Sequence, residues 1–91
     1  MQYKNEKTLT YIKTLGSIIH KKRLEICKEA RYNFCNSYEL DSSNLRRIEN
    51  GEIESKITML LRIAEALNIS LSELIKDVER ELGDNFHVIE Q

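Results

Sequence analysis

Residues 40–75 read LDSSNLRRIENGEIESKITMLLRIAEALNISLSELI, and the pattern in this stretch decides the fold. Apolar residues recur every three or four positions in three short runs, as they do on one face of a helix. Asp41 suits a helix N-cap, because its carboxylate can accept backbone N–H groups two or three residues later. Gly51 suits the left-handed residue that ends a helix, and Ser70 with Glu73 makes a capping box. The stretch therefore predicts three helices joined by two tight connections.

The helix expected at 42–49 has an apolar side and a polar side. Leu45 and Ile48 are three residues apart and lie on the side expected to face the core. The outward side carries the polar residues Ser42, Ser43, Arg46 and Arg47. An arginine pair at an unknown position is most often solvated surface charge. Here the pair lies on a short helix within a helical scaffold, which is also the arrangement of a helix that enters a DNA groove.

The next two helices are expected to supply much of the core. The first is expected to be capped by Ser55 and ended by Asn68, and its apolar stripe has helical spacing. The members of that stripe are Ile57, Leu60, Leu61, Ala64 and Leu67. The second spans 71–82 and ends at Gly83. Its apolar set is Leu71, Leu74, Ile75, Val78 and Leu82.

Upstream of residue 40, helical spacing predicts one long helix and one short helix. The long helix covers about 7–26, and its basic end, Lys21–Arg23, suits the negative C-terminal end of the helix dipole. Its apolar residues are Leu9, Tyr11, Ile12, Leu15, Ile18, Ile19 and Leu24. A shorter helix over 30–37 would place Ala30, Phe34 and Cys35 on one face.

The composition supports a small all-α domain. The 91-residue chain has no proline and three glycines, and it is rich in good helix formers. This length fits one domain, which we divide into a flexible N-terminus at 1–6, a helical domain at 7–82 and a tail at 83–91. No apolar run is long enough to span a bilayer, and no signal peptide is evident. We therefore expect a soluble, cytoplasmic protein without membrane contact.

The net charge of −1 conceals an asymmetry along the chain. Residues 1–47 contain ten Lys or Arg and five Asp or Glu, a balance of +5. Residues 48–91 contain four and ten, a balance of −6. A basic half and an acidic half are expected if one face meets phosphates. Chance clustering of charges on solvated helices would give the same counts.

Metal, cofactor and enzyme signatures are absent from the sequence. Cys27 and Cys35 are eight residues apart, and no second Cys or His pair follows at zinc-ligand spacing. We expect both to be reduced, buried, apolar residues. His20 and His87 have no carboxylate or Cys partner at catalytic or ligand spacing. No glycine-rich phosphate loop and no nucleophile with a base appears, so we predict no enzyme, no cofactor, no metal site and no small-molecule ligand.

Two segments carry a resemblance to a known family. The chain resembles the phage repressor/Cro-type (XRE-like) helix-turn-helix family in the segments LRRIENG at 45–51 and LRIAEALNISLSEL at 61–74. The separation between the two segments also fits this family. The resemblance covers residues 15–75. It implies a five-helix DNA-binding domain, in which the second helix rests across the DNA backbone and the third lies in the major groove. In this chain those helices would be 30–37 and 42–49.

The resemblance also implies roles for residues of the third helix and its surroundings. Ser42, Ser43 and Arg47 fall where the family reads base edges, and Arg46 lies one residue before the last of these. An arginine can bond O6 and N7 of one guanine together. The two serines can equally reach phosphates, and Arg46 can face a base, a phosphate or solvent. The residues expected to contact the DNA backbone are Arg31, Asn44, Asn50 and Lys56.

Arg23 and Glu49 fall where the family often keeps a semi-buried ion pair, which would orient the recognition helix. The chain also departs from the family pattern. The second helix starts without the usual glycine or polar turn, and the span from Arg23 to Glu49 is one residue longer than is typical. The loop after Gly51 is often basic in the family, but here it carries Glu52 and Glu54. Acidic residues there would repel phosphates and weaken binding by a monomer.

These features predict a sequence-specific, double-stranded-DNA-binding transcriptional regulator, most simply a repressor, acting as a homodimer on a near-palindromic operator. The dimer surface would come from the last helix and the β-prone run with Phe86, Val88 and Ile89. This run either packs on the core or pairs as a strand with a partner chain. The alternative function is a protein-interaction module of the same fold, such as an antitoxin or a partner-binding regulator, which the negative net charge and the acidic loop favour.

Overall fold

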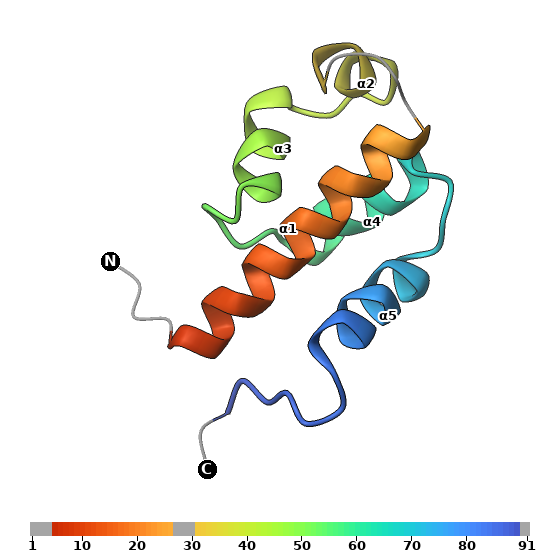
Figure 1. Ribbon diagram of the computed structural model, residues 1–91. Helices are drawn as coiled ribbons and strands as arrows, with labels where there is room; N and C mark the ends of the chain where they lie inside the picture. Colours follow the sequence, from red (N-terminus) through yellow and green to blue (C-terminus); the bar gives the residue numbers. More distant parts are fainter. Residues whose placement is uncertain (1–4, 27–30, 90–91) are drawn as a thin grey trace.

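The computed structural model describes residues 5–26 and 31–89, and over these residues it is all-helical (Figure 1). Within this part of the chain there are five helices, in the order α1 (Glu6–Ile26), α2 (Arg31–Ser37), α3 (Ser42–Glu49), α4 (Ile57–Ala66) and α5 (Leu71–Leu82). The predicted all-α class and the five-helix arrangement are confirmed. Residue 30, the predicted start of the second helix, lies outside the described residues.

Local side-chain caps explain where several helices start. The Asn5 side chain accepts a hydrogen bond from the Thr8 backbone N–H at 2.7 Å, at the start of α1. Asp41 Oδ1 accepts from the Ser43 N–H at 3.0 Å and caps α3, as predicted. Ser70 Oγ accepts from the Glu73 N–H at 3.1 Å and caps α5, also as predicted. Each cap satisfies a backbone donor that has no partner within its helix.

The start of α4 differs from the prediction. Lys56 occupies the N-cap position and makes no side-chain cap. Ser55 was the predicted cap, but its hydroxyl donates to the Lys56 carbonyl at 3.1 Å. The chain reaches α4 in an extended conformation, with Lys56 at ψ 153°. This geometry makes Lys56, one residue later than predicted, the last residue before the helix.

Two helix ends use residues expected to tolerate a left-handed backbone, whereas after α2 it is Glu39 that has a positive φ, +56°. Gly51, just after α3, has φ +72°, and Asn68, just after α4, has φ +62°. Only glycine, and less readily asparagine, adopts these angles at low cost. Gly51 therefore ends α3 before the connection to α4, and the turn at Asn68 leads directly into α5, which packs on α4.

Helix α1 is the centre of the arrangement. It packs against α3 and against α5, while α2 packs on α3 and α4 packs on α5. Figure 1 shows α1 running between α3 and α5, with α2 beyond one end of α3. The recognition helix predicted at 42–49 is therefore held at the edge of the molecule by α1 and α2.

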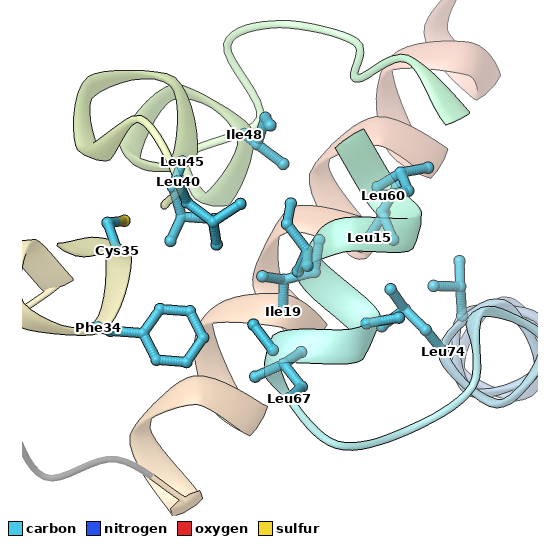
Figure 2. Packing of buried hydrophobic residues seen from close by; sticks show 14 residues of the cluster. Leu15, Ile19, Phe34, Cys35, Leu40, Leu45, Ile48, Leu60, Leu67 and Leu74 are labelled. Atoms are coloured by element: carbon cyan, nitrogen blue, oxygen red, sulfur yellow. The ribbon is translucent and has the colours of Figure 1, made fainter. Parts of the chain in front are cut away.

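The core draws a residue or more from every helix and from the connections (Figure 2). Ile19 of α1, Leu45 of α3 and Leu74 of α5 are among the largest side chains that are almost completely buried. Phe34 and Cys35 of α2 close the same cluster on one side. Burial raises the pKa of the Cys35 thiol. The predicted role of Cys35 as a small apolar core residue is confirmed, while Cys27 lies outside the described residues.

The inner face of α4 differs from the predicted stripe. Ile57 and Leu61 were expected in the core, but 69% and 42% of their surface is exposed. The buried residues of this segment are Leu60, Ile63, Ala64, Ala66 and Leu67. Apolar residues occupy more than half of the circumference of α4, so the spacing alone could not select which of them pack on α5. The consequence is an apolar pair, Ile57 and Leu61, on the surface one helical turn apart.

Gly16 allows α1 and α3 to cross at close range. A Cβ atom added to Gly16 would overlap the carbonyl oxygen of Ile48 and would lie 2.9 Å from that of Glu49. Both of these neighbours are backbone atoms of α3. The contact therefore fixes the distance between the two helices without any side chain between them.

The described part of the tail, 83–89, forms turns and bends and no strand. The Phe86 ring packs against Tyr11 of α1, with 6.5 Å between ring centroids. The Asn5 side-chain amide donates to the Val88 carbonyl at 2.9 Å. Of the two arrangements left open by the sequence, these contacts within one chain correspond to packing on the core.

Among the described residues, no helix has the length and apolar character needed to cross a membrane.

Candidate nucleic-acid interface

Helix α3 divides into a buried side and an outward side. Leu45, Ile48 and Glu49 are buried, with exposures of 0, 3 and 7%. On the other side, Ser43 and Arg47 are exposed. Ser42, Asn44 and Arg46 are partly exposed, at the margins between the two sides. The structure thus brings the predicted base-contact residues together on one outward surface of α3.

The two arginines of α3 differ in their surroundings. Arg46 Nη1 lies 3.6 Å from Glu52 Oε2, in the connection after the helix. Arg47 has no side-chain hydrogen bond or ion pair with any other residue that the structure describes. An arginine with an unsatisfied planar fork has five donors available for an external acceptor. Arg47 is therefore better placed than Arg46 to reach a base edge, because no carboxylate competes for it.

Arg23 and Glu49 form a buried, bidentate ion pair between α1 and α3. Arg23 Nε lies 2.6 Å from Glu49 Oε2, and Nη2 lies 3.1 Å from Oε1. The two side chains are 4% and 2% exposed. Two parallel bonds from one guanidinium restrict both the distance and the rotation of the partner helix. The geometry of the predicted ion pair is present, and it links α1 directly to the end of α3.

His20 also contacts this carboxylate, which the sequence analysis missed. The ring Nδ1 lies 3.0 Å from Glu49 Oε1, although the sequence shows no carboxylate at catalytic or ligand spacing from His20. The two residues are 29 positions apart, so no local spacing could reveal the contact. Burial by itself would raise the pKa of Glu49. Hydrogen bonds from Arg23 and His20, together with their charges, outweigh burial and lower the pKa of Glu49, so the carboxylate is ionised at neutral pH.

Arg31, at the start of α2, faces the same carboxylate. Its Nη1 lies 3.7 Å from Glu49 Oε1, and 30% of the side chain is exposed. Arg31 was predicted to contact the DNA backbone. The observed contact directs part of its guanidinium towards Glu49, and a phosphate contact by the exposed remainder stays a prediction.

Of the other residues expected to contact the DNA backbone, two lie at the ends of the connection from α3 to α4 and one lies in the first turn of α3. Asn50 is exposed and donates weakly to Glu52, with 3.4 Å between Nδ2 and Oε2. Lys56 is exposed just before α4. Asn44 is partly exposed on α3 itself. These three residues therefore have accessible donor groups, although they are spread over both sides of the acidic connection.

The residues predicted for dimerisation are divided between buried and exposed positions. Phe86 is half-buried against Tyr11. Val88 and Ile89 have 40% and 74% of their surface exposed. The exposed α4 pair, Ile57 and Leu61, was predicted to lie in the core and was not part of the predicted dimer surface. The described residues contain no group of three or more His, Cys, Asp or Glu that could hold a metal ion.

Comparison with known proteins gives two matches and one negative result. A family model described as helix-turn-helix matches residues 40–74, the segment from the residue before the α3 cap into α5. The chain is also similar to "Control protein C.MunI" of Mycoplasma sp, with 33% identity over 66 residues. That alignment covers 72% of this chain and 89% of the relative. No solved structure matches the chain.

Proposed function

The chain belongs to the Cro/C1-type helix-turn-helix family of DNA-binding transcriptional regulators, and we propose that it binds a near-palindromic operator as a homodimer. In this proposal the outward side of α3 enters the major groove of each half-site. The observation that carries it is the division of α3: Leu45, Ile48 and Glu49 anchor the helix, and the opposite side offers Arg47, which has no partner among the described residues. The proposed action is repression in the cytoplasm.

The proposed contacts fall into two groups. Ser42, Ser43, Arg46 and Arg47 face base edges, while Arg31, Asn44, Asn50 and Lys56 face the DNA backbone. The Arg23–Glu49 pair supports them by fixing the orientation of α3. Base contacts give sequence preference, and backbone contacts give position and salt-dependent affinity. The Glu52 carboxylate pairs with Arg46 and partly neutralises its positive charge. It also repels phosphates, so the electrostatic attraction of one monomer for DNA is limited.

Arg47→Ala tests the base-reading role. Operators are first selected from a pool of random duplexes, and binding is then followed by fluorescence anisotropy. We expect the variant to lose roughly 1–3 kcal/mol of operator affinity, or about 5–150-fold in Kd, and to lose preference at one base position. The matched control is Arg80→Ala on α5, whose side chain is 70% exposed and lies 3.0 Å from Asp77.

Three results would contradict this assignment. If Arg47→Ala weakens binding to every duplex equally, Arg47 contacts a phosphate and not a base. If Arg47→Ala and Arg80→Ala have the same small effect, neither arginine reads DNA. A wild-type protein without any preference among duplexes at moderate salt would exclude sequence-specific binding altogether.

A homodimer would compensate for the few backbone contacts of one monomer. Two copies related by a two-fold axis would place their recognition helices about one DNA turn, roughly 34 Å, apart. The exposed apolar side chains support such an interface, and the largest exposed fractions are at Ile57 on α4 and Ile89 in the tail. We propose that Ile57 and Leu61 meet the same residues of a second copy, with Val88 and Ile89 of the tail extending the interface. Phe86 contributes indirectly, by holding the tail against Tyr11.

A charge on α4 tests the dimer surface. Each substitution enters a two-fold interface twice, so we expect Ile57→Glu with Leu61→Glu to be monomeric by analytical ultracentrifugation and to lose at least about tenfold in operator affinity, or about 1.4 kcal/mol. Thr58→Glu, exposed on the same helix, is the matched control and should remain dimeric. Ile89→Glu probes the tail separately. A dimer that survives the α4 change and dissociates with Ile89→Glu would place the interface in the tail instead.

A further inference from the structure

Lys13 lies on the side of α1 that runs beside the C-terminal end of α3. A Cβ atom added to Gly51 would be 2.6 Å from Lys13 Cγ and 3.0 Å from Lys13 Cα. Three residues further along α1, Gly16 meets the Ile48 and Glu49 carbonyls, and one turn beyond that His20 meets the Glu49 carboxylate. Residues three and four apart share one side of a helix. The place of Lys13 beside Gly51 is therefore fixed by backbone packing.

The ammonium group of Lys13 has no partner among the residues that the structure describes. Lys13 is exposed, and its ammonium forms no ion pair or side-chain hydrogen bond with the other described residues. Lys22, on the same helix, is different: its Nζ lies 2.6 Å from Asp77 Oδ2 of α5. Lys13 thus combines a stem held against Gly51 with a cationic end available to an external acceptor.

The surroundings of Lys13 show why such a cation matters. The connection after α3 carries Glu52 and Glu54, and Glu52 lies 3.6 Å from Arg46. The two carboxylates therefore offset part of the positive charge that Arg46, Arg47 and Lys56 bring to this side of the proposed DNA interface. Helix α1 contributes a further cation here, because the Lys13 stem lies against Gly51, the residue directly after Asn50.

We propose that Lys13 contacts a phosphate of the DNA backbone beside the end of the recognition helix. The contact extends the interface from the helix-turn-helix to α1 and offsets the acidic connection. The ligand class is the phosphodiester backbone of duplex DNA, without regard to base sequence. The inference rests on the proposed function, because α3 must lie against the duplex for Lys13 to reach it. The competing role is internal: an ammonium near the carbonyl end of α3 would stabilise the helix dipole.

Lys13→Gln separates the two roles, because it removes the charge and keeps a helix-compatible side chain. Binding of wild type and variant is measured over a series of salt concentrations, on the selected operator and on a random duplex. A lost phosphate contact reduces the slope of log K against log salt by about 0.9 per monomer, or about 1.8 for a dimer. We also expect affinity at low salt to fall several-fold by a similar factor on both duplexes. Lys76→Gln, an exposed lysine of α5, is the matched control and should keep the wild-type slope.

The outcomes are distinct. A Lys13→Gln protein with the wild-type salt slope overturns the proposal, whatever its affinity. A lower unfolding temperature with an unchanged slope assigns Lys13 to the end of α3 and also overturns it. A slope that falls equally in the Lys76→Gln control shows a general charge effect and no local contact. If wild type shows salt-dependent binding without preference among duplexes, the proposed operator function fails, while the Lys13 contact is still decided by the slope on the random duplex.

Discussion

Gly16→Ala is expected to destabilise the protein by roughly 1–3 kcal/mol, the usual cost of forcing extra atoms into a packed site. At an exposed helix position the same change would stabilise by about 1 kcal/mol, because glycine is a poor helix former. At Gly16 the substitution should lower the stability instead, because the added Cβ meets backbone oxygens of Ile48 and Glu49, which cannot rotate away. For a domain of this size, the loss corresponds to a fall of roughly 4–24 °C in Tm. Circular dichroism during thermal unfolding measures it.

The matched control is Ser17→Ala, one residue along α1, where the side chain is exposed. It should change the unfolding free energy little, within about 0.5 kcal/mol. We also expect Gly16→Ala to weaken operator binding by more than its effect on folding explains, because α3 must shift away from α1. A Gly16→Ala protein that is more stable than wild type would show that the two helices do not cross at this distance.

Arg23→Met is the second substitution for which a large effect is expected. It leaves the buried Glu49 carboxylate without its bidentate partner, and breaking such a pair typically costs about 3–5 kcal/mol. His20 and Arg31 still lie within 4 Å of this carboxylate, so we expect a value near the lower end. Urea unfolding followed by circular dichroism gives the loss directly. Operator affinity should fall as well, since α3 would lose the contact that fixes its rotation.

The double variant Arg23→Met with Glu49→Met supplies the test of mechanism. When both charges are removed, the stranded carboxylate is gone, and the double variant should be more stable than the sum of the single losses implies. The matched control is Lys22→Met, next to Arg23 on α1. Its pair with Asp77 is about 30% exposed on both sides, so its removal should cost at most about 1 kcal/mol. Strictly additive losses for Arg23 and Glu49 would mean that the two charges do not depend on each other.

Features encoded by neighbouring residues could be predicted from the sequence. The caps at Asp41 and Ser70 each join a side chain to a backbone N–H only two or three residues away. The residue types at these positions are therefore enough to predict the caps. The bounds of α3 and α5 followed from these caps and from Gly51 and Gly83 at their ends. The Arg23–Glu49 pair, 26 residues apart, was reached only through the resemblance to the helix-turn-helix family.

Features that depend on how the helices meet could not be predicted. The contact of His20 with Glu49 and the crossing at Gly16 arise because α1 passes α3, and neither leaves a periodic pattern in the chain. The predicted stripe of α4 was right for Leu60, Ala64 and Leu67 and wrong for Ile57 and Leu61, because most residues of this helix are apolar and the spacing did not fix the edge of the buried side. The β-prone tail was ambiguous for a related reason. Its preference for a strand depends on a partner strand, and within one chain Phe86 packs on Tyr11 instead.

The separation of α3 into two sides has a consequence for engineering. Leu45, Ile48 and Glu49 contribute the attachment to the rest of the molecule, whereas Ser43 and Arg47 contribute almost nothing to it. The outward positions can therefore be randomised in a library without disturbing folding. Variants retargeted to new operators should emerge from such a library with the melting behaviour of the parent protein.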